Sequence, residues 1–209
     1  MKIDPEFKIA LSLLEPKEKD KLIVRLLKHD SVLTQRLYFE LVDDRSISER
    51  RAVIESRIDS ETKRMGNYFT STGALMMELR YLSGEITEHL KITKDKIGEA
   101  SLNLRMLNKT LSLTNKFIEN THIMRAQKLC VYIIARAFKI LVLIDALHED
   151  FFLEFKEELQ KLGERIGGNN NLVTVAIHNG FDVNWLLSLE IPENISEIHT
   201  QIRKQGFLK

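Results

Sequence analysis

Cysteine, proline and glycine are scarce in this sequence. Cys130 is the single cysteine among 209 residues, so no disulfide can form within the chain. A lone cysteine fits a reducing compartment, and we expect a cytoplasmic protein. Three prolines and nine glycines leave little room for flexible linkers or low-complexity segments. The scarcity of these residues therefore favours a compact globular chain.

An excess of either charge is also lacking. Thirty-one basic side chains oppose 30 acidic ones, so the formal net charge is only +1. The whole chain thus does not attract a polyanion by its overall field. The longest apolar run, residues 129–147, contains Arg136 and Lys139 near its middle. A membrane span needs about 20 residues with few charges, so we expect a buried core helix and no membrane association.

Motifs that identify common enzymes are missing as well. The chain contains no glycine-rich phosphate loop, cysteine pair, nucleophile elbow or His-Glu-x-x-His sequence. Whether the protein is an enzyme stays uncertain on this basis, and the absence of such a motif favours a non-enzymatic role.

Helical periodicity is the strongest signal that is present. Apolar residues recur at spacings of three or four over residues 75–90, 97–111 and 152–166. Such seams are typical of helices that pack at shallow angles in bundles. We predict an all-α fold with an antiparallel core of about four helices, at roughly 70–91, 94–114, 121–147 and 149–166.

The remaining segments complete the predicted organisation. Helix-start signals at Asp4-Pro5, Pro16 and Asp30 predict three short helices within residues 1–45. Ser46 and Glu49 form a capping-box pattern that opens a charged helix at 46–66, whose apolar stripe is thin. We expect that helix to lie on the surface or to reach toward a partner. Residues 67–168 form the four-helix core, and residues 169–209 form a C-terminal helical cap.

One segment of this cap allows two interpretations. Apolar residues alternate with small or polar ones between 173 and 185, around Asn179-Gly180, as they would in a β-hairpin. The alternative is a short helix that ends at Gly180, with Phe181 as the apolar contact after it and Asp182 capping the next helix. We favour two short helices, because an isolated hairpin is marginally stable.

A basic stripe follows one side of the predicted central helix. A helical wheel places five residues within a narrow sector: Arg125, Lys128, Tyr132, Arg136 and Lys139. The cations could meet phosphates while the tyrosine ring stacks on a base, which makes the stripe a candidate nucleic-acid interface. A solvated helix face whose lysine and arginine stems cover apolar neighbours explains the same pattern.

A second candidate site combines carboxylates and histidines. Up-and-down topology would bring the end of the central helix close to the end of the helix at 70–91. The residues concerned are Glu85, His89, Asp145 and His148. Asp145 faces the apolar arc of its helix, where a carboxylate needs a partner. The four side chains could bind a divalent metal or act as an acid and base pair. Apart from this possible metal we expect no cofactor.

Three functions follow from these features. The first is a non-enzymatic helical protein that acts through protein–protein interaction or self-assembly. The second is a nucleic-acid-associated protein that uses the basic stripe. The third is a metal-dependent or acid/base enzyme that uses the carboxylate and histidine cluster.

Overall fold

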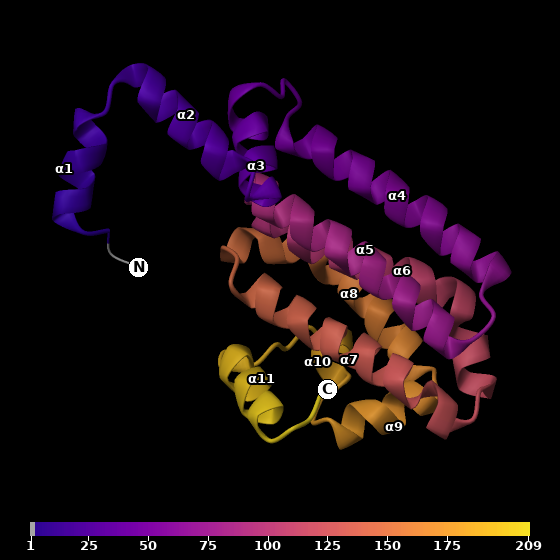
Figure 1. Ribbon diagram of the computed structural model, residues 1–209. Coiled ribbons are helices and arrows are strands. Elements are labelled where there is room, and N and C mark those ends of the chain that lie inside the picture. The colour runs from indigo at the N-terminus through magenta and orange to yellow at the C-terminus, as the bar shows by residue number, and fades with distance from the viewer. Residues whose placement is uncertain (1–2) are drawn as a thin grey trace. The chain divides into compact units, whose positions relative to one another are not determined.

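The computed structural model describes residues 3–209, except the side chain of Glu149, and confirms the all-α prediction. These residues form eleven helices and no strand (Figure 1). The chain divides into two compact units. The N-terminal unit comprises residues 1–45 together with 91–93, and the core unit comprises residues 46–90 and 94–209.

The N-terminal unit contains three short helices, α1 (Pro5–Leu13), α2 (Pro16–Leu27) and α3 (Ser31–Leu41). Local sequence explains where each begins. The carboxylate of Asp4 accepts the backbone N–H of Glu6 at 2.8 Å, and that of Asp30 accepts the N–H of Leu33 at 2.9 Å. Pro16 occupies the first turn of α2, where a missing N–H costs nothing. No residue of α1, α2 or α3 is buried.

The core unit contains the longer helices. They are α4 (Ile47–Tyr68), α5 (Thr72–Thr93), α6 (Lys96–Asn120), α7 (Ile123–Asp145), α8 (Glu149–Gly167), α9 (Asn170–His178), α10 (Asn184–Leu187) and α11 (Ile195–Lys204). The last three residues of α5 belong to the N-terminal unit. Only Lys94 and Asp95 separate α5 from α6, and Lys94 adopts a left-handed conformation with φ of 60°. This tight connection makes α5 and α6 antiparallel, as predicted.

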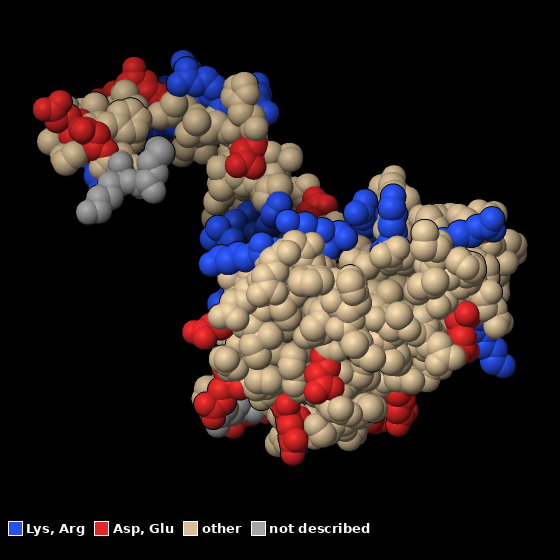
Figure 2. All heavy atoms as spheres, turned by 90° about the horizontal axis from the view of Figure 1, so that it is seen from below, with Lys and Arg blue, Asp and Glu red and all other residues tan. Residues whose placement is uncertain are grey.

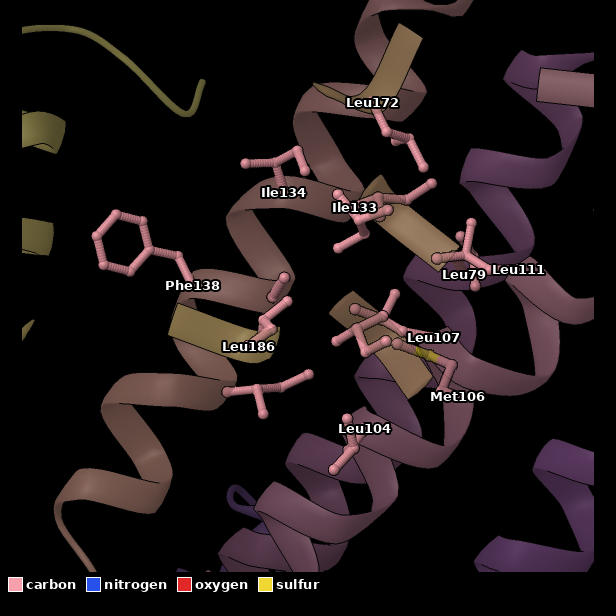
Figure 3. Close-up of a cluster of buried hydrophobic side chains, with 14 of the residues drawn as sticks. Leu79, Leu104, Met106, Leu107, Leu111, Ile133, Ile134, Phe138, Leu172 and Leu186 are labelled. Atoms are coloured by element: carbon pink, nitrogen blue, oxygen red, sulfur yellow. The ribbon is translucent and has the colours of Figure 1, made fainter. Parts of the chain in front are cut away.

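Two helices, α6 and α7, form the middle of the core unit. Helix α6 packs against α4, α7, α8 and α9, while α7 packs against α6, α9 and α11. Their buried side chains form the apolar cluster shown in Figure 3, with Leu104, Leu107 and Leu111 from α6 and Ile133 and Ile134 from α7. The apolar run that includes most of α7 is therefore a core helix. The number of helices in the core exceeds the four that periodicity predicts.

Polar contacts complete the burial of α6 against the following helices. Asn108 is 4% exposed and donates to the backbone carbonyl of Glu158 at 2.8 Å. Arg165 donates to Asn108 Oδ1 at 2.6 Å, and Asn115 donates to the carbonyl of Arg165 at 2.8 Å. Asn169 in turn donates to Asn115 Oδ1 at 2.6 Å. Because these amides are hydrogen-bonded, α6 is buried despite a partly polar sequence.

Several predicted boundaries were wrong. Helix α4 continues through Gly66 and Asn67 to Tyr68, and α6 continues through Asn115 to Asn120. Tertiary packing supports both extensions: Met65 is 2% exposed and Ile118 is fully buried. The thin stripe of α4 also belongs to the core, because Ile58 is fully buried where α4 packs on α6. Helix α4 thus lies on the surface of the core unit, as expected, but it packs one face on α6, which its thin apolar stripe did not indicate.

Residues 173–185 contain the end of α9, a turn and the start of α10, and no strand, so the favoured interpretation of two short helices is confirmed. Gly180 ends α9 with φ of 68°, and the N–H of Phe181 donates to the carbonyl of Ala176 at 2.9 Å. Phe181 is 2% exposed, and the carboxylate of Asp182 accepts the N–H of Asn184 at 2.9 Å. This is the left-handed glycine termination with an apolar contact that the sequence suggested.

Candidate nucleic-acid interface

Helices α5, α7 and α11 and the residues after α11 surround a groove of about 680 Å³ in the core unit. Four of the five stripe residues line it, and Arg125 does not. Cations from three other places join them: Arg80 of α5, Arg203 of α11, and Lys209. Among the described residues, no aspartate or glutamate lines the groove. Figure 1 shows α11 beside α7, as their packing requires.

The groove has an apolar floor beneath its cations. Met76 of α5 and Val131 and Ala135 of α7 are half-buried and face it, together with the buried Leu208. The N–H of Leu208 donates to Asn179 Oδ1 at 2.8 Å, so the segment after α11 is fastened to the body of the unit. The groove therefore combines a fixed apolar surface with a cationic rim.

Tyr132 is held in place by its hydroxyl group. The hydroxyl lies 2.7 Å from Ser83 Oγ and donates to the backbone carbonyl of Leu79 at 3.1 Å. It also accepts a hydrogen bond of 3.3 Å from Arg136, whose guanidinium lies 5.3 Å from the centre of the tyrosine ring. Because Arg136 covers the ring, a base could stack on that face only if Arg136 moved. Tyr132 instead orients Arg136 along the groove.

Pairing distinguishes Lys139 from the other cations. Its ammonium lies 2.5 Å from a carboxylate oxygen of the buried Glu99, so most of its charge is already compensated. Among the side chains that the structure describes, none forms an ion pair with Arg80, Lys128, Arg136, Arg203 or Lys209. Five cationic side chains are thus available to an anion.

His199 joins the groove to the aromatic core. Its ring lies 5.0 Å from that of Phe138, which also contacts Phe181 at 5.4 Å and Trp185 at 5.6 Å. In Figure 3, Phe138 points away from the leucines of the central cluster. Burial and the nearby Arg203 lower the pKa of His199. The lowered pKa favours the neutral form of His199, and its ring adds a surface to the groove.

Basic and acidic side chains are also segregated on the face of the core unit that Figure 2 shows. Lysine and arginine gather along one margin and aspartate and glutamate along the opposite one, with largely uncharged surface between. This segregation concentrates positive potential locally although the chain is almost neutral.

The four residues of the predicted metal site have other surroundings. Among the described residues, no three His, Cys, Asp or Glu side chains gather closely enough to hold a metal ion. Glu85 lies 3.4 Å from Arg57. His148 caps α8, where its Nδ1 accepts the N–H of Asp150. Asp145 is exposed, so the prediction that it points into the core was wrong. It is the last residue of α7, where the helix no longer encloses it.

His89 takes part in a buried ion-pair network in place of a metal site. Its Nε2 lies 3.2 Å from Asp95, and Arg51 donates to the same carboxylate at 2.6 and 2.8 Å. Burial alone raises the pKa of Asp95, but hydrogen bonds from Arg51, the Gly98 N–H and His89 lower it overall. Gly98 is required here, because a Cβ at this position would overlap the Asp95 carboxylate. The network fastens α4 to the α5–α6 connection.

Cys130 offers no reactive thiol. It is fully buried, and desolvation raises its pKa to about 12. The thiolate that nucleophilic chemistry needs is therefore not populated at neutral pH.

No family model, curated protein sequence or solved structure matches the chain. Within residues 3–209, no helix combines the length and hydropathy that crossing a bilayer requires. The basic stripe predicted from the sequence includes the α7 part of the groove but not Arg80, Arg203 or Lys209. The missing signal is tertiary, because nothing in the pattern of α11 indicates that Arg203 faces the stripe on α7.

Proposed function

We propose that the protein acts by binding another protein, or a second copy of itself, through the N-terminal unit. The observation that carries this proposal is the exposure of apolar side chains there. Among the described residues of this unit, eleven large hydrophobic side chains are exposed: Ile3, Phe7, Ile9, Leu13, Ile23, Val24, Leu26, Leu33, Tyr38, Leu41 and Val42. Exposed apolar surface on this scale marks interaction sites in soluble proteins.

The lengths of the helices support the same proposal. Helices α1, α2 and α3 contain 9, 12 and 11 residues. Isolated helices shorter than about 12–15 residues are marginal in water, and their stability normally comes from packing an apolar face. Without a buried residue, these helices have little to offset the conformational entropy of ordering, about 1–2 kcal/mol per residue. A partner surface would supply the missing burial.

Helix α2 is the best defined binding element. Ile23 and Leu26 are 49% and 54% exposed and lie three positions apart, so they share one side of the helix. Lys21, Arg25 and Lys28 are exposed around them. An amphipathic helix of this kind binds by laying its apolar side chains in a groove of the partner.

The test compares two double variants of α2. Ile23→Ser with Leu26→Ser removes the apolar contact, whereas Lys21→Ser with Lys28→Ser makes two exposed substitutions to the same residue. Sedimentation velocity measures self-association, and quantitative co-purification measures a complex with one defined protein. We expect the apolar variant to lose the assembly and the lysine variant to retain it.

Two results would contradict the proposal. One is a wild-type protein that stays monomeric, co-purifies with no defined protein, and protects its N-terminal amides from exchange in isolation. The other is an assembly that both variants retain equally.

A further inference from the structure

We propose that the groove between α5, α7 and α11 is a binding site for a small organic polyphosphate, of the class to which nucleoside triphosphates belong. This site is separate from the N-terminal surface and does not depend on its function. Every residue that lines the groove belongs to the core unit.

The positive charge of the groove favours an anionic ligand. Five cationic side chains without an ion-pair partner converge on it, and no carboxylate side chain among the described residues lines it. Cations that are gathered without counter-charges repel one another. A ligand with several negative charges in a small volume would relieve this repulsion, whereas a single carboxylate would neutralise only a fraction of it.

Arginine geometry favours phosphate among the possible anions. Arg80, Arg136 and Arg203 present planar guanidinium groups, which bind phosphate oxygens through two parallel hydrogen bonds. Arg136 is already oriented by the Tyr132 hydroxyl, and Tyr132 is fixed by Leu79 and Ser83. Such preorganisation reduces the entropy lost on binding.

The apolar floor indicates that the ligand is more than inorganic phosphate. Met76, Val131 and Ala135 would stay in contact with water if only phosphate groups were bound. His199 adds a ring that lines the groove and contacts Phe138, with the ring centres 5.0 Å apart. A flat ring or another apolar group could cover this floor while the phosphates meet the cationic rim.

Size favours a small molecule over a nucleic-acid strand. A volume of about 680 Å³ lies within the range of sites for ligands of nucleotide size. A strand would need a basic track that continues beyond the groove, but Arg125, at the start of the stripe, lies outside its lining. The near-neutral net charge of +1 also gives no long-range field for a long polyanion.

The experiment measures binding of four probes by isothermal titration calorimetry at low ionic strength, with EDTA present. The probes are ATP, inorganic tripolyphosphate, adenosine and a short single-stranded oligodeoxynucleotide. We expect ATP to bind more tightly than tripolyphosphate, which lacks a group for the apolar floor, and adenosine to bind least. Added salt should weaken ATP binding, because the rim is exposed to solvent.

Two double variants that remove the same charge, one inside and one outside the groove, test whether ATP binds in the groove. Arg136→Gln with Arg203→Gln should weaken ATP binding by about tenfold or more, since each removes a charge-assisted hydrogen bond. Lys116→Gln with Lys204→Gln removes the same charge at exposed positions outside the lining and should change the affinity by less than about twofold. If loss of Arg136 impairs folding, Lys128→Gln with Arg203→Gln replaces the first variant, because both of its side chains are exposed.

Three results would overturn the proposal. The first is no ATP binding at low ionic strength. The second is equal weakening by groove and control variants, or equal affinity for ATP and tripolyphosphate, since either would show unspecific charge attraction. The third is an oligonucleotide that binds more tightly than ATP and depends on Arg136 and Arg203, which would make the groove a nucleic-acid interface.

Discussion

The two units of this chain obtain helical structure in different ways. In the N-terminal unit, local signals such as Asp4 and Asp30 define helices that bury no residue. In the core unit, α6 alone buries thirteen residues, and five of them are polar side chains. Good caps can therefore specify where a helix begins without giving it tertiary stability. The contrast underlies the proposal that the N-terminal unit binds a partner, whereas the core unit forms a scaffold for the groove.

Hydrogen exchange should reveal the largest difference between the units. We expect amides in the middle of α6 and α7 to exchange only by global unfolding, which costs about 5–15 kcal/mol in typical domains, and thus to show protection on the order of 10⁴-fold or more. Amides of α1 and α2 should show less than about 100-fold protection in the isolated protein, because their helices lack buried contacts. Mass spectrometry of exchanged peptides measures both. Similar amide protection in α2 and α6 would show that the two units do not differ in stability.

Truncating one leucine in each unit tests how much its burial contributes to the free energy of unfolding. Leu107 is fully buried in α6, and Leu107→Ala should destabilise the protein by about 3–5 kcal/mol through lost burial and a cavity. Leu26 is 54% exposed, and Leu26→Ala should change stability by less than about 0.5 kcal/mol. Urea unfolding followed by circular dichroism gives both values. A large cost for Leu26→Ala in the monomer would show that this side chain is buried in solution.

An ion pair from each unit provides the next comparison. Asp95→Asn removes the charge that holds Arg51 and His89 and should cost about 2–4 kcal/mol at neutral pH, because the carboxylate is buried. Glu40→Gln breaks the exposed pair with Arg36 and should cost no more than about 0.5 kcal/mol. Unfolding midpoints in urea measure both effects.

The effect of Asp95→Asn should depend on pH in a defined direction. The folded-state pKa of Asp95 lies below its ordinary value of 3.8. The charged carboxylate therefore stabilises the fold above that value, and the contribution disappears as the pH falls through the folded-state pKa. The stability difference between wild type and variant should shrink below about pH 4. A difference that is independent of pH would assign the cost to packing alone.

Asp145 should give the smallest effect, with the opposite sign. Partial desolvation raises its pKa, and its carboxylate ends α7, where the helix dipole disfavours a negative charge. A raised pKa means that the stabilising contribution is present at low pH and is lost as the pH rises. Asp145→Asn should therefore stabilise the protein by a few tenths of a kcal/mol at pH 7, and not near pH 3.

Asp150 is the matched control for Asp145. It lies in the first turn of α8, where a negative charge is favourable, so Asp150→Asn should slightly destabilise the protein. Thermal unfolding at both pH values measures the two variants. A strongly destabilising Asp145→Asn would contradict this prediction, because it would mean that the charged carboxylate makes a favourable interaction in the folded protein.

Local and periodic signals account for most of what could be predicted. The starts of α1, α3 and α4 follow from Asp4, Asp30 and Ser46, because a cap is a contact between residues two or three positions apart. The end of α9 at Gly180 follows in the same way. The ends of α4 and α6 did not follow, because packing at Met65 and Ile118 outweighs the low helix propensity of Gly66 and Asn115.

The sequence by itself determined the all-α class, the caps and the burial of α7, because these depend on neighbours along the chain. Only the tertiary structure decided which polar residues meet. In the folded chain His89 contacts Asp95, and Asp145 is exposed to solvent. Arg203 of α11 lines the same groove as the stripe on α7. The physical reason is that a side chain's partner depends on how whole helices pack. Helical periodicity gives the face on which a residue lies, and it does not give the helix that covers that face.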